Sequence, residues 1–383
     1  MPKLIRITTV PMALRYLLPG QMRFMKEQGM EVLMISADGK ELSEVIEQEQ
    51  CRHIIVPLTR KITPFQDLIC LFRLIRIFIK EKPDIVHTHT PKAGLLGMLA
   101  AKFSSVPIRI HTVAGLPMMV EKGFKYWLLK TMEKLTYWAA TQVWPNSPSL
   151  LQFISTHQLT EPAKLRLIGP GSSNGINTEL FNRDNMDAAT LHSIRQNIQY
   201  DEKNTYLLFI GRLVTDKGIP ELIGVFTAMQ KDHEQLKLIL VGEREDALDP
   251  LPKNCLEVIE NDPNVIHIPW TQEVKYYMYL ANYFIFPSHR EGFPNVLLQA
   301  GAMQLPVICS RIPGNIDIIR HKETGLIFET GNEDEMRACL ETALGDPEAM
   351  HQMALVLAEQ VNLNYRRENI WQNILDAYKS LLN

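Results

Sequence analysis

The stretch Tyr283-Phe-Ile-Phe-Pro-Ser-His-Arg-Glu-Gly-Phe-Pro-Asn-Val-Leu-Leu-Gln-Ala-Gly-Ala302 contains the transition that decides the fold of this chain. Its apolar start, which ends at Pro287, has the composition of a buried strand. A helical pattern begins near Pro294, and the polar loop between the two presents Glu291. A buried strand that passes through a short loop into a helix is one half of a βαβ unit. The segment therefore predicts a parallel sheet covered by helices.

Short apolar runs alternate with helical patterns along the rest of the chain, which extends this prediction to a fold made of βαβ units. The expected strands are Leu4–Thr9, Glu31–Ser36, Ile54–Pro57, Asp84–Thr88, Arg109–Val113, Gln142–Pro145, Tyr206–Ile210, Lys237–Val241, Val265–Ile268, Tyr283–Pro287 and Pro306–Cys309. The expected helices are Gln21–Glu27, Phe65–Glu81, Gly94–Phe103, Phe124–Ala140, Pro220–Lys231, Gln272–Leu280, Pro294–Ala302, Glu333–Leu344 and Arg366–Leu382. Because parallel sheets bind ligands beyond the carboxyl ends of their strands, residues at those ends are the candidates for function.

The length of 383 residues suits two α/β domains better than one. The polar, glycine-rich segment Gly169–Gly175 interrupts the alternation and can supply unusual backbone angles, so we expect a hinge there. The predicted fold class is α/β, with two doubly wound, Rossmann-like domains that face each other across a cleft. Their expected bounds are 1–175 and 176–365, and residues 366–383 form a final helix.

The composition excludes several classes of protein. Hydrophobic residues make up 46% of the chain, which is enough for two cores. The formal net charge of -3 provides no field that would make nucleic acid the main partner. The five cysteines are odd in number and far apart, which argues against a disulfide framework and a zinc site. With no signal-peptide pattern and no apolar run long enough to span a bilayer, we expect a cytoplasmic protein.

The first chemical motif is Gly211-Arg-Leu-Val-Thr-Asp-Lys-Gly218, at the end of the first strand of the second domain. Gly211 permits a close approach of the backbone, and Arg212 and Lys217 place two cations at a strand end. Cations at this position can neutralise a diphosphate and stabilise its charge as it leaves. A turn with solvated basic side chains would contain the same residues, so this motif alone leaves both interpretations open.

The second motif is the loop that carries Glu291. Its backbone amides and the start of the following helix form an anion site suited to phosphate, and Pro294 suits a first helical turn. Glu291 could accept hydrogen bonds from sugar hydroxyls, and Gln299 lies further along the same helix. A charge, a permissive glycine and an aromatic residue occur together in Arg290-Glu-Gly-Phe-Pro294, which makes this motif the more specific of the two.

Together these motifs resemble those of the large family-4 retaining glycosyltransferases of GT-B fold. The similarity consists of Gly-Arg-x4-Lys-Gly followed, about seventy residues later, by Pro-Ser-x2-Glu-Gly-Phe-Pro-Asn-Val. It continues through Pro306–Ile308, Pro313–Asn315, Glu323–Ile327, Asp84–Gly94 and Gly171–Ile176, so it covers nearly the whole chain. The similarity is greatest to the branch that extends bacterial capsule and lipid-linked oligosaccharide chains.

The resemblance implies transfer of a hexose or N-acetylhexosamine from a nucleoside-diphosphate sugar, with UDP favoured over GDP, to a lipid-linked or other glycan acceptor. It implies catalytic roles for Arg212 and Lys217, which would hold the donor diphosphate, and for Glu291, which would bind the donor sugar. The implied donor-binding residues are Gly211, Gly292, Phe293, Pro294, Asn295 and Gln299. Ile268–Glu273 would line the nucleobase pocket and Gly314–Ile316 would lie near it, while the final helix would cross back onto the first domain.

Two positions depart from the family pattern. The family usually has a glutamate where this chain has Gln299, whose neutral amide can still bind ribose hydroxyls. The family also often carries a cleft histidine where this chain has Ala114. We therefore take His89, Lys92 and His111 as the acceptor-side candidates of the first domain.

No Asp-x-Asp occurs in the chain, although that pair commonly binds the divalent metal that carries a diphosphate. We therefore expect no metal and no other cofactor, with Arg212 and Lys217 in the place of the metal. Contact with the inner membrane surface is a further hypothesis, because Leu68–Lys80 puts basic residues on one helical face and Met118–Leu129 mixes basic, aromatic and apolar residues in a presumed loop. For the first segment, a core helix with a solvated basic stripe explains the pattern equally well.

Two alternatives to a transferase stay open. A sugar-nucleotide epimerase could use the same two-domain scaffold, since fold alone does not decide function. A degenerate relative that only binds nucleotide sugar or a partner enzyme would explain Gln299 and Ala114. The presence of Glu291, Arg212 and Lys217 in the chain argues against the degenerate relative.

Overall fold

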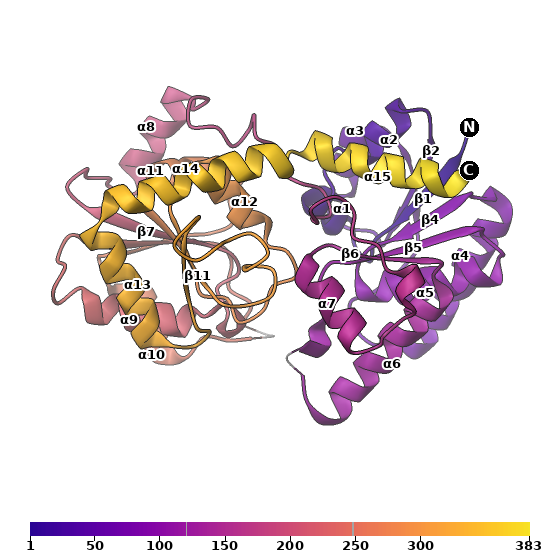
Figure 1. Cartoon of the computed structure of the whole chain (residues 1–383), viewed down its shortest axis with the longest axis horizontal. Helices are drawn as coiled ribbons and strands as arrows, with labels where there is room; N and C mark the ends of the chain where they lie inside the picture. Colours follow the sequence, from indigo (N-terminus) through magenta and orange to yellow (C-terminus); the bar gives the residue numbers. More distant parts are fainter. Residues whose placement is uncertain (120, 247–248) are drawn as a thin grey trace. The chain divides into compact units, whose positions relative to one another are not determined.

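The computed structural model describes residues 1–119, 121–246 and 249–383. The chain forms two compact units (Figure 1). The first unit consists of Met1–Gly175 together with Arg367–Asn383, and the second consists of Ile176–Arg366. Each unit is built around one parallel, six-stranded sheet. The predicted α/β fold class is therefore confirmed.

The two sheets have the same topology. The first contains β1 (Lys3–Ile7), β2 (Glu31–Ser36), β3 (Arg52–Ile55), β4 (Ile85–Thr88), β5 (Ile108–Val113) and β6 (Gln142–Pro145), in the order β3-β2-β1-β4-β5-β6. The second contains β7 (Thr205–Ile210), β8 (Leu236–Val241), β9 (Val265–Ile268), β10 (Tyr283–Phe286), β11 (Val307–Ser310) and β12 (Leu326–Phe328), in the order β12-β11-β10-β7-β8-β9. The strand order reverses between β1 and β4 and between β7 and β10. Doubly wound sheets bind ligands at such switch points.

The helices of the first unit cover both faces of its sheet. They are α1 (Pro11–Leu17), α2 (Gln21–Glu27), α3 (Leu42–Glu49), α4 (Pro64–Glu81), α5 (Pro91–Phe103), α6 (Gly123–Ala139), α7 (Pro148–Thr156) and α15 (Arg367–Leu382), with 3₁₀ turns η1 (Pro117–Met119) and η2 (Pro162–Lys164). Because successive strand residues point to opposite faces, two cores form. Ile5 and Ile7 belong to the core under α4, α5 and α6, whereas Leu4 belongs to the core that includes α2 and α15.

The second unit has one continuous core. Its helices are α8 (Ala188–Asn197), α9 (Ile219–Met229), α10 (Lys253–Asn261), α11 (Val274–Leu280), α12 (Asn295–Ala302), α13 (Glu333–Gly345) and α14 (Pro347–Asn364), with the 3₁₀ turn η3 (Thr215–Lys217). The central strands β7 and β10 are apolar along most of their length, as expected for a sheet that helices cover on both faces.

Each predicted strand and helix is present, with small shifts at its ends. The pattern analysis missed α1, α3, α7, α8, α10, α14 and β12. The start of α14 was marked in the sequence, because the Asp346 side chain caps the helix at the Ala349 amide and Pro347 occupies its first turn. β12 is only three residues long, too short for a periodicity to appear.

The predicted unusual backbone angles of Gly169–Gly175 are confirmed. Gly169, Gly171, Ser172 and Gly175 all have positive φ, between 55° and 106°. At Gly171 a Cβ atom would lie 2.6 Å from the carbonyl oxygen of Asn146, so the chain passes too close to the end of β6 for any larger residue.

Candidate functional site

The two motifs of the second unit meet at its switch point. β7 pairs with β10 through Leu207–Tyr283 and Leu208–Phe284, so the turn after β7 and the loop after β10 leave the same edge of the sheet. Gly218 ends the first motif with φ of +70°, and a Cβ atom there would lie 2.3 Å from the carbonyl oxygen of Pro287. This contact requires glycine, and it fixes the first motif against the start of the second.

Lys217 and Glu291 form an ion pair across this edge. The Nζ atom of Lys217 contacts Oε1 of Glu291, and the Ser288 hydroxyl donates to the same carboxylate oxygen at 3.1 Å. The Lys217 and Glu291 side chains are only 12% and 16% exposed. Two of the three predicted catalytic residues are therefore in contact, although they are far apart in the sequence. A half-buried pair of this kind provides one cation and one hydrogen-bond acceptor at a single point.

A second layer of ion pairs holds the Glu291 loop. Arg290 donates from Nη2 to Oδ2 of Asp216 at 2.9 Å, and the His289 amide donates to the Asp216 carbonyl at 3.0 Å. Nε2 of His289 lies 2.8 Å from Oε1 of Glu221 on α9. The hydrogen bond to this carboxylate raises the pKa of His289, and the same contact lowers the pKa of Glu221. The loop is thus attached to both η3 and α9 by paired charges.

The other cation of the first motif has a different partner. Arg212 pairs with Glu245, and its side chain is 49% exposed. Within residues 1–119, 121–246 and 249–383, no ion pair joins Arg212 to Glu291. The close backbone approach that we expected at Gly211 is made by Gly242, where a Cβ atom would lie 1.9 Å from the Gly211 carbonyl oxygen.

The helix that follows the Glu291 loop offers free backbone amides. α12 begins at Asn295, and its N-cap residue Pro294 provides no side-chain hydrogen bond. Pro294 therefore lies one position before the first helical turn in which we expected it. Phe293 is buried and packs against Tyr365 with ring centroids 5.6 Å apart, so its ring anchors the loop. Gln299 is partly exposed on α12.

The segments expected near the nucleobase border the same strand ends. Gly314 has φ of +89°, and a Cβ atom there would lie 2.7 Å from the Gly292 carbonyl oxygen, so this turn lies directly against the Glu291 loop. Ile268 ends β9 and its carbonyl accepts a hydrogen bond from the Gly242 amide at 2.9 Å. These contacts bring both segments to the carboxyl edge of the second sheet.

The switch point of the first unit holds a buried polar cluster. Arg6 of β1 pairs in register with His87 of β4, and Nη1 of Arg6 lies 2.7 Å from Nδ1 of His87. The hydroxyl of Tyr378, from α15, contacts both. His89 follows β4 and stacks on His87 with ring centroids 4.8 Å apart. Burial lowers the pKa of both histidines well below the usual range, so both rings are neutral.

The other two acceptor-side candidates lie elsewhere. His111 faces the opposite side of the sheet, where it bonds Thr88 at 2.9 Å and lies under Gly94 of α5. Burial lowers the pKa of His111 to about 4. Lys92 forms an ion pair with Asp67 of α4 at 2.8 Å. His89, His111 and Lys92 therefore do not form one cluster.

Comparison with known proteins identifies the family. The family described as glycosyl transferases group 1 matches residues 192–355, and the glycosyl transferase 4-like domain matches residues 19–171. CapM of Staphylococcus aureus, a capsular polysaccharide biosynthesis glycosyltransferase, is 35% identical over 382 residues, which cover 99% of this chain and 97% of CapM. The chain belongs to the group 1 glycosyltransferases.

More distant relatives agree with this family. An Escherichia coli enzyme named UDP-Gal:alpha-D-GlcNAc-diphosphoundecaprenol alpha-1,3-galactosyltransferase is 24% identical over 309 residues, 79% of this chain and 77% of the relative. The crystal structure of Anabaena HepE in complex with UDP superimposes with a TM-score of 0.81 at 16% identity, covering 99% of this chain and 100% of HepE. The fold of this glycosyltransferase is therefore GT-B, as predicted.

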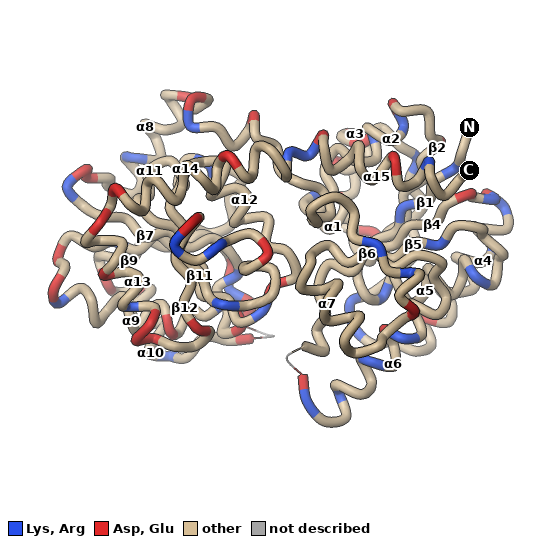
Figure 2. Tube along the Cα trace, in the orientation of Figure 1, with Lys and Arg blue, Asp and Glu red and all other residues tan. Residues whose placement is uncertain are grey.

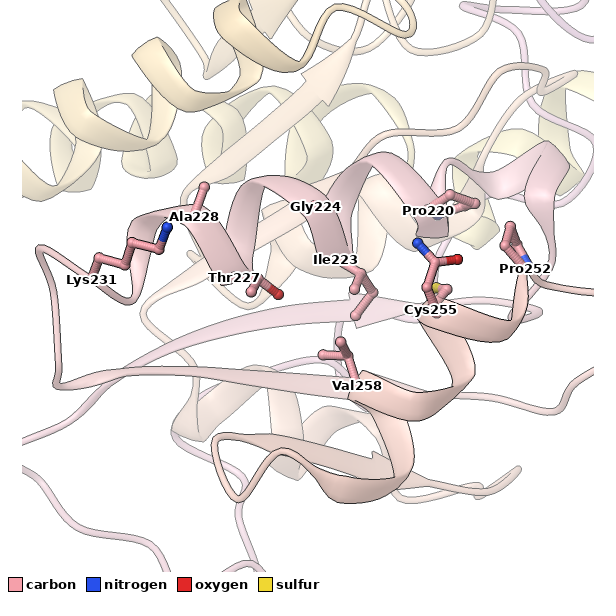
Figure 3. Close-up of a pocket in the computed structure, with 10 residues that line it drawn as sticks. Pro220, Ile223, Gly224, Thr227, Ala228, Lys231, Pro252, Cys255 and Val258 are labelled. Atoms are coloured by element: carbon pink, nitrogen blue, oxygen red, sulfur yellow. The ribbon is translucent and has the colours of Figure 1, made fainter.

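The second unit also has a hollow that no residue of either motif lines. It is a groove between α9 and α10, in which Ile223 and Thr227 of α9 face Cys255 and Val258 of α10 (Figure 3). Burial raises the pKa of the Cys255 thiol to about 11, so the thiol is unreactive at neutral pH.

No cluster of three or more His, Cys, Asp or Glu side chains is arranged to hold a metal ion in the part of the chain that the structure describes. None of the described helices is long and apolar enough to cross a bilayer.

The sequence analysis missed some residues of both clusters. His289 and Arg290 belong to the loop that carries Glu291. Two basic side chains next to a predicted site residue could have indicated that they form ion pairs with neighbouring elements, as they do with α9 and η3. Arg6 and Tyr378 gave no such signal, because they come from opposite ends of the sequence and meet only in the folded unit.

Proposed function

We propose that this glycosyltransferase transfers a hexose or N-acetylhexosamine, with retention, from a nucleoside-diphosphate sugar to a lipid-linked or other glycan acceptor. The second unit would hold the donor and the first would hold the acceptor. The observation that carries the proposal is the Lys217–Glu291 pair at the β7/β10 switch point. UDP is the favoured nucleotide, because the E. coli relative is named for a UDP-galactose donor and HepE was crystallised with UDP.

The pathway is inferred from the relatives. CapM is named for capsular polysaccharide biosynthesis, and the E. coli relative is named for a diphosphoundecaprenol-linked acceptor. We therefore propose that the chain builds a capsule or another cell-envelope glycan on the cytoplasmic side of the membrane. The near full-length similarity to CapM supports this assignment.

The residues suggest how the donor would be held. Glu291 would accept hydrogen bonds from sugar hydroxyls, while Lys217, whose charge the Glu291 carboxylate balances in the structure, would turn towards the donor diphosphate. The free amides at the start of α12 and the Arg212 guanidinium would add donors to the same phosphates. All of these groups would stabilise the negative charge that develops on the leaving diphosphate. Such electrostatic stabilisation is usually the largest single contribution to catalysis.

The reaction would then be a front-face displacement. A phosphate oxygen of the departing diphosphate would accept the proton of the acceptor hydroxyl on the same face of the sugar, so no separate protein base is required. Ala114, which stands where the family often has a histidine, carries no group that could act as a base. Protein cations would replace a divalent metal.

Donor binding tests the proposal. Thermal unfolding would be followed with UDP-, GDP-, ADP- and dTDP-sugars in the presence of a chelator, for wild type, Lys217→Met and Glu291→Gln. A donor present at about 100 times its Kd stabilises a protein by about 2.7 kcal/mol, which is readily detected. Stabilisation by one nucleotide class that both variants lose supports the donor site. The same stabilisation in the variants would place donor binding elsewhere.

Product analysis separates the proposal from its alternatives. A retaining transferase consumes the donor only when an acceptor is present and yields an α-linked product from an α-linked donor. A sugar-nucleotide epimerase would convert the donor without an acceptor. A degenerate relative would bind a donor without converting it under either condition.

We also propose that the first unit lies on an anionic membrane. α5 and α6 contribute several exposed aromatic residues, among them Phe124 (77% exposed), Trp127 (61%) and Phe103 (62%). Figure 2 shows Lys and Arg along α5 and α6, and Nζ of Lys102 lies 4.2 Å from the ring centroid of Trp138. Aromatic side chains mixed with lysines are suited to a bilayer interface.

The two segments that suggested membrane contact have different structures. α4 exposes Arg73, Arg76 and Lys80 on one face, as the helical pattern predicted. Most of Met118–Leu129, which we took for a loop, belongs to η1 and to the first turns of α6, and Val120 lies outside the described residues. The helix forms here because Gly123, with φ of 61°, turns the chain into a run of good helix formers.

Vesicle sedimentation tests the membrane contact. Wild type should sediment with vesicles that contain phosphatidylglycerol at low salt and much less with phosphatidylcholine alone. A Phe124→Ser, Trp127→Ser double variant should bind about tenfold more weakly or worse, since it removes two large apolar groups. Leu180→Ser, which changes an exposed apolar residue of the second unit, is the matched control. Equal binding of all three proteins would contradict the proposal.

A further inference from the structure

The switch point of the first unit contains a small cavity. It lies where β4, β5 and β6 end, and Arg6, His89, Trp144, Asn146 and Ser172 line it. Its volume of about 10 Å³ is room for about one water-sized atom. These residues are at most 6% exposed, so the cavity belongs to the interior of the unit.

Arg6 brings a positive charge to this cavity without a counter-ion. Its side chain is completely buried, and its Nη atoms bond to Tyr378, His87 and Gln21, which are all neutral. No carboxylate contacts Arg6 in the part of the chain that the structure describes. Glu49 is the one carboxylate whose charge acts on Arg6, and its oxygens accept hydrogen bonds from the amides of Gly20 and Arg23.

A buried guanidinium in such surroundings is unfavourable. Arginine stays charged in proteins, and burying a charge without a partner costs several kcal/mol. Burial lowers the pKa of Arg6, as expected for a charge removed from water. Neutral hydrogen-bond acceptors replace part of the lost hydration, but they do not neutralise the charge.

The walls of the cavity also hold polar atoms without partners. Nε of Arg6, Nε1 of Trp144, Nε2 of His89 and Oδ1 of Asn146 are all buried and make no hydrogen bond with any residue that the structure describes. Buried polar atoms are nearly always hydrogen-bonded, so four on one cavity indicate a missing common partner.

Most of these groups can donate to that partner. Arg6 Nε and Trp144 Nε1 are fixed donors, and neutral His89 can carry its proton on Nε2. The amide of Asn146 donates to the Ser173 hydroxyl at 3.3 Å. Turning this amide over would preserve that contact and point its NH₂ group into the cavity, because the two amide atoms are interchangeable in such a contact. Up to four N–H groups can thus converge on one point beside a positive charge.

We propose that this cavity is an anion site, which holds one monatomic anion or one oxygen atom of a carboxylate or phosphate group. The size of the cavity limits the occupant to a single atom, and the charge of Arg6 selects a negative one. A water molecule could satisfy the same polar atoms but would leave the guanidinium charge without compensation. The inference is independent of the donor site proposed in the second unit.

The site would add an ion-dependent element to the stability of the first unit. Tyr378 joins α15 to Arg6, and the ring of Trp144 stacks on the ring of Tyr378 with centroids 5.7 Å apart. An anion bound between Arg6 and Trp144 would therefore stabilise the attachment of the C-terminal helix to the sheet. Ligands that bind only the folded state stabilise it in proportion to their occupancy.

Thermal unfolding in different sodium salts tests the site. At matched ionic strength, bromide should raise the Tm of wild type by about 2–4 °C relative to gluconate, whose carboxylate is attached to a bulky polyol chain. Acetate and inorganic phosphate form the second arm of the experiment. Stabilisation by bromide alone identifies a halide site, and stabilisation by acetate or phosphate identifies an oxyanion group as the occupant.

Two variants connect the effect to this cavity. Asn146→Asp places a carboxylate in the wall, where it can neutralise Arg6, so the bromide effect should disappear. Trp144→Phe removes one N–H donor and should weaken the effect. Trp371→Phe is the matched control, because this indole donates to Asn174 at 2.7 Å within the same unit but does not line the cavity.

Diffraction from a crystal soaked in bromide gives the second measurement. An anomalous peak between Arg6 and Trp144 that is absent in Asn146→Asp would establish the site. An unchanged Tm of wild type in every salt, or a bromide effect that Asn146→Asp retains in full, would overturn the proposal. If Trp144→Phe fails to fold, the Asn146→Asp comparison still decides between these outcomes.

Discussion

The two switch points of this glycosyltransferase treat charge in opposite ways. At the β7/β10 edge, Lys217 is paired with Glu291, Arg290 with Asp216 and His289 with Glu221, and all these side chains keep some exposure. At the β1/β4 edge, Arg6 is fully buried and contacts only neutral groups. The topology is the same in both units, so the difference comes from side chains and not from the fold.

This difference indicates two kinds of polar site. Paired and partly exposed charges are inexpensive to bury and can exchange partners when a ligand enters, as a substrate site requires. A buried charge with neutral partners destabilises the unit unless an ion or a ligand compensates it. The switch point of the second unit is therefore the better candidate for a substrate site. The switch point of the first unit is the better candidate for an anion that stays bound.

The largest expected effect concerns the paired charges of the second unit. Lys217→Met and Glu291→Gln should each lower kcat by about 10²–10³-fold, the usual loss when a preorganised charge contact to the transition state is removed. Because the two side chains touch, the double variant should lose much less than the product of the single effects. Initial rates with the donor that stabilises the protein would measure all three variants.

An exposed ion pair of the same unit provides the control. Arg320 and Glu323 pair at 3.1 Å with side chains 57% and 64% exposed, so Arg320→Met should leave kcat within about twofold of wild type. Rates of Lys217→Met and Glu291→Gln that match this control would show that the switch point of the second unit is not catalytic.

The next effect concerns the buried cluster of the first unit. Tyr378→Phe removes the hydroxyl that contacts both Arg6 and His87, which leaves a charge and an imidazole with fewer partners. We expect a loss of about 1–3 kcal/mol in the free energy of unfolding, measured with urea. Tyr126→Phe, at a partly exposed position of α6, should lose less than about 0.5 kcal/mol. A loss as small for Tyr378→Phe would mean that the Arg6 charge is stabilised by other groups.

The same contrast explains which parts could be predicted from the sequence. The strand-loop-helix stretch at Tyr283–Ala302 gave the fold class and the Glu291 loop, because all of its parts are contiguous. The contact of Lys217 with Glu291 required only the pairing of β7 with β10, which the topology of a doubly wound sheet supplies.

The cluster of the first unit was beyond such an argument. Arg6, His87, Trp144 and Tyr378 stand alone in the sequence, and each has an ordinary alternative role as a surface or core residue. Lys92 was taken for a candidate because it follows a strand, but it forms an ion pair with Asp67 of α4. No sequence motif connects Asp67 with Lys92. Side chains that meet through tertiary packing leave no pattern in a single sequence.

The smallest expected effect is a pH dependence of the donor site in the second unit. The contact between His289 and Glu221 shifts the two pKa values in opposite directions. The pKa of His289 is raised and the pKa of Glu221 is lowered. The raised His289 pKa contributes stability that is complete below the unfolded value, about 6.5, and is lost as pH rises through the folded pKa. The lowered Glu221 pKa contributes stability that is lost as pH falls through the folded pKa of that carboxyl, below about 4.3.

Donor affinity should therefore decrease a few-fold when pH rises through the folded pKa of His289, because the Glu291 loop loses its attachment to α9. His289→Gln keeps a hydrogen-bond donor that does not titrate, so its donor affinity should vary less over the same pH range. The charges of Asp216 and Asp249 also raise the pKa of His289, after the larger contribution of Glu221. Donor titrations at several pH values would measure this change in affinity, and a pH profile that wild type and His289→Gln share would exclude this ion pair as the titrating group.

His87 and His89 of the first unit are already neutral, so the bromide response of the first unit should not change over the same pH range.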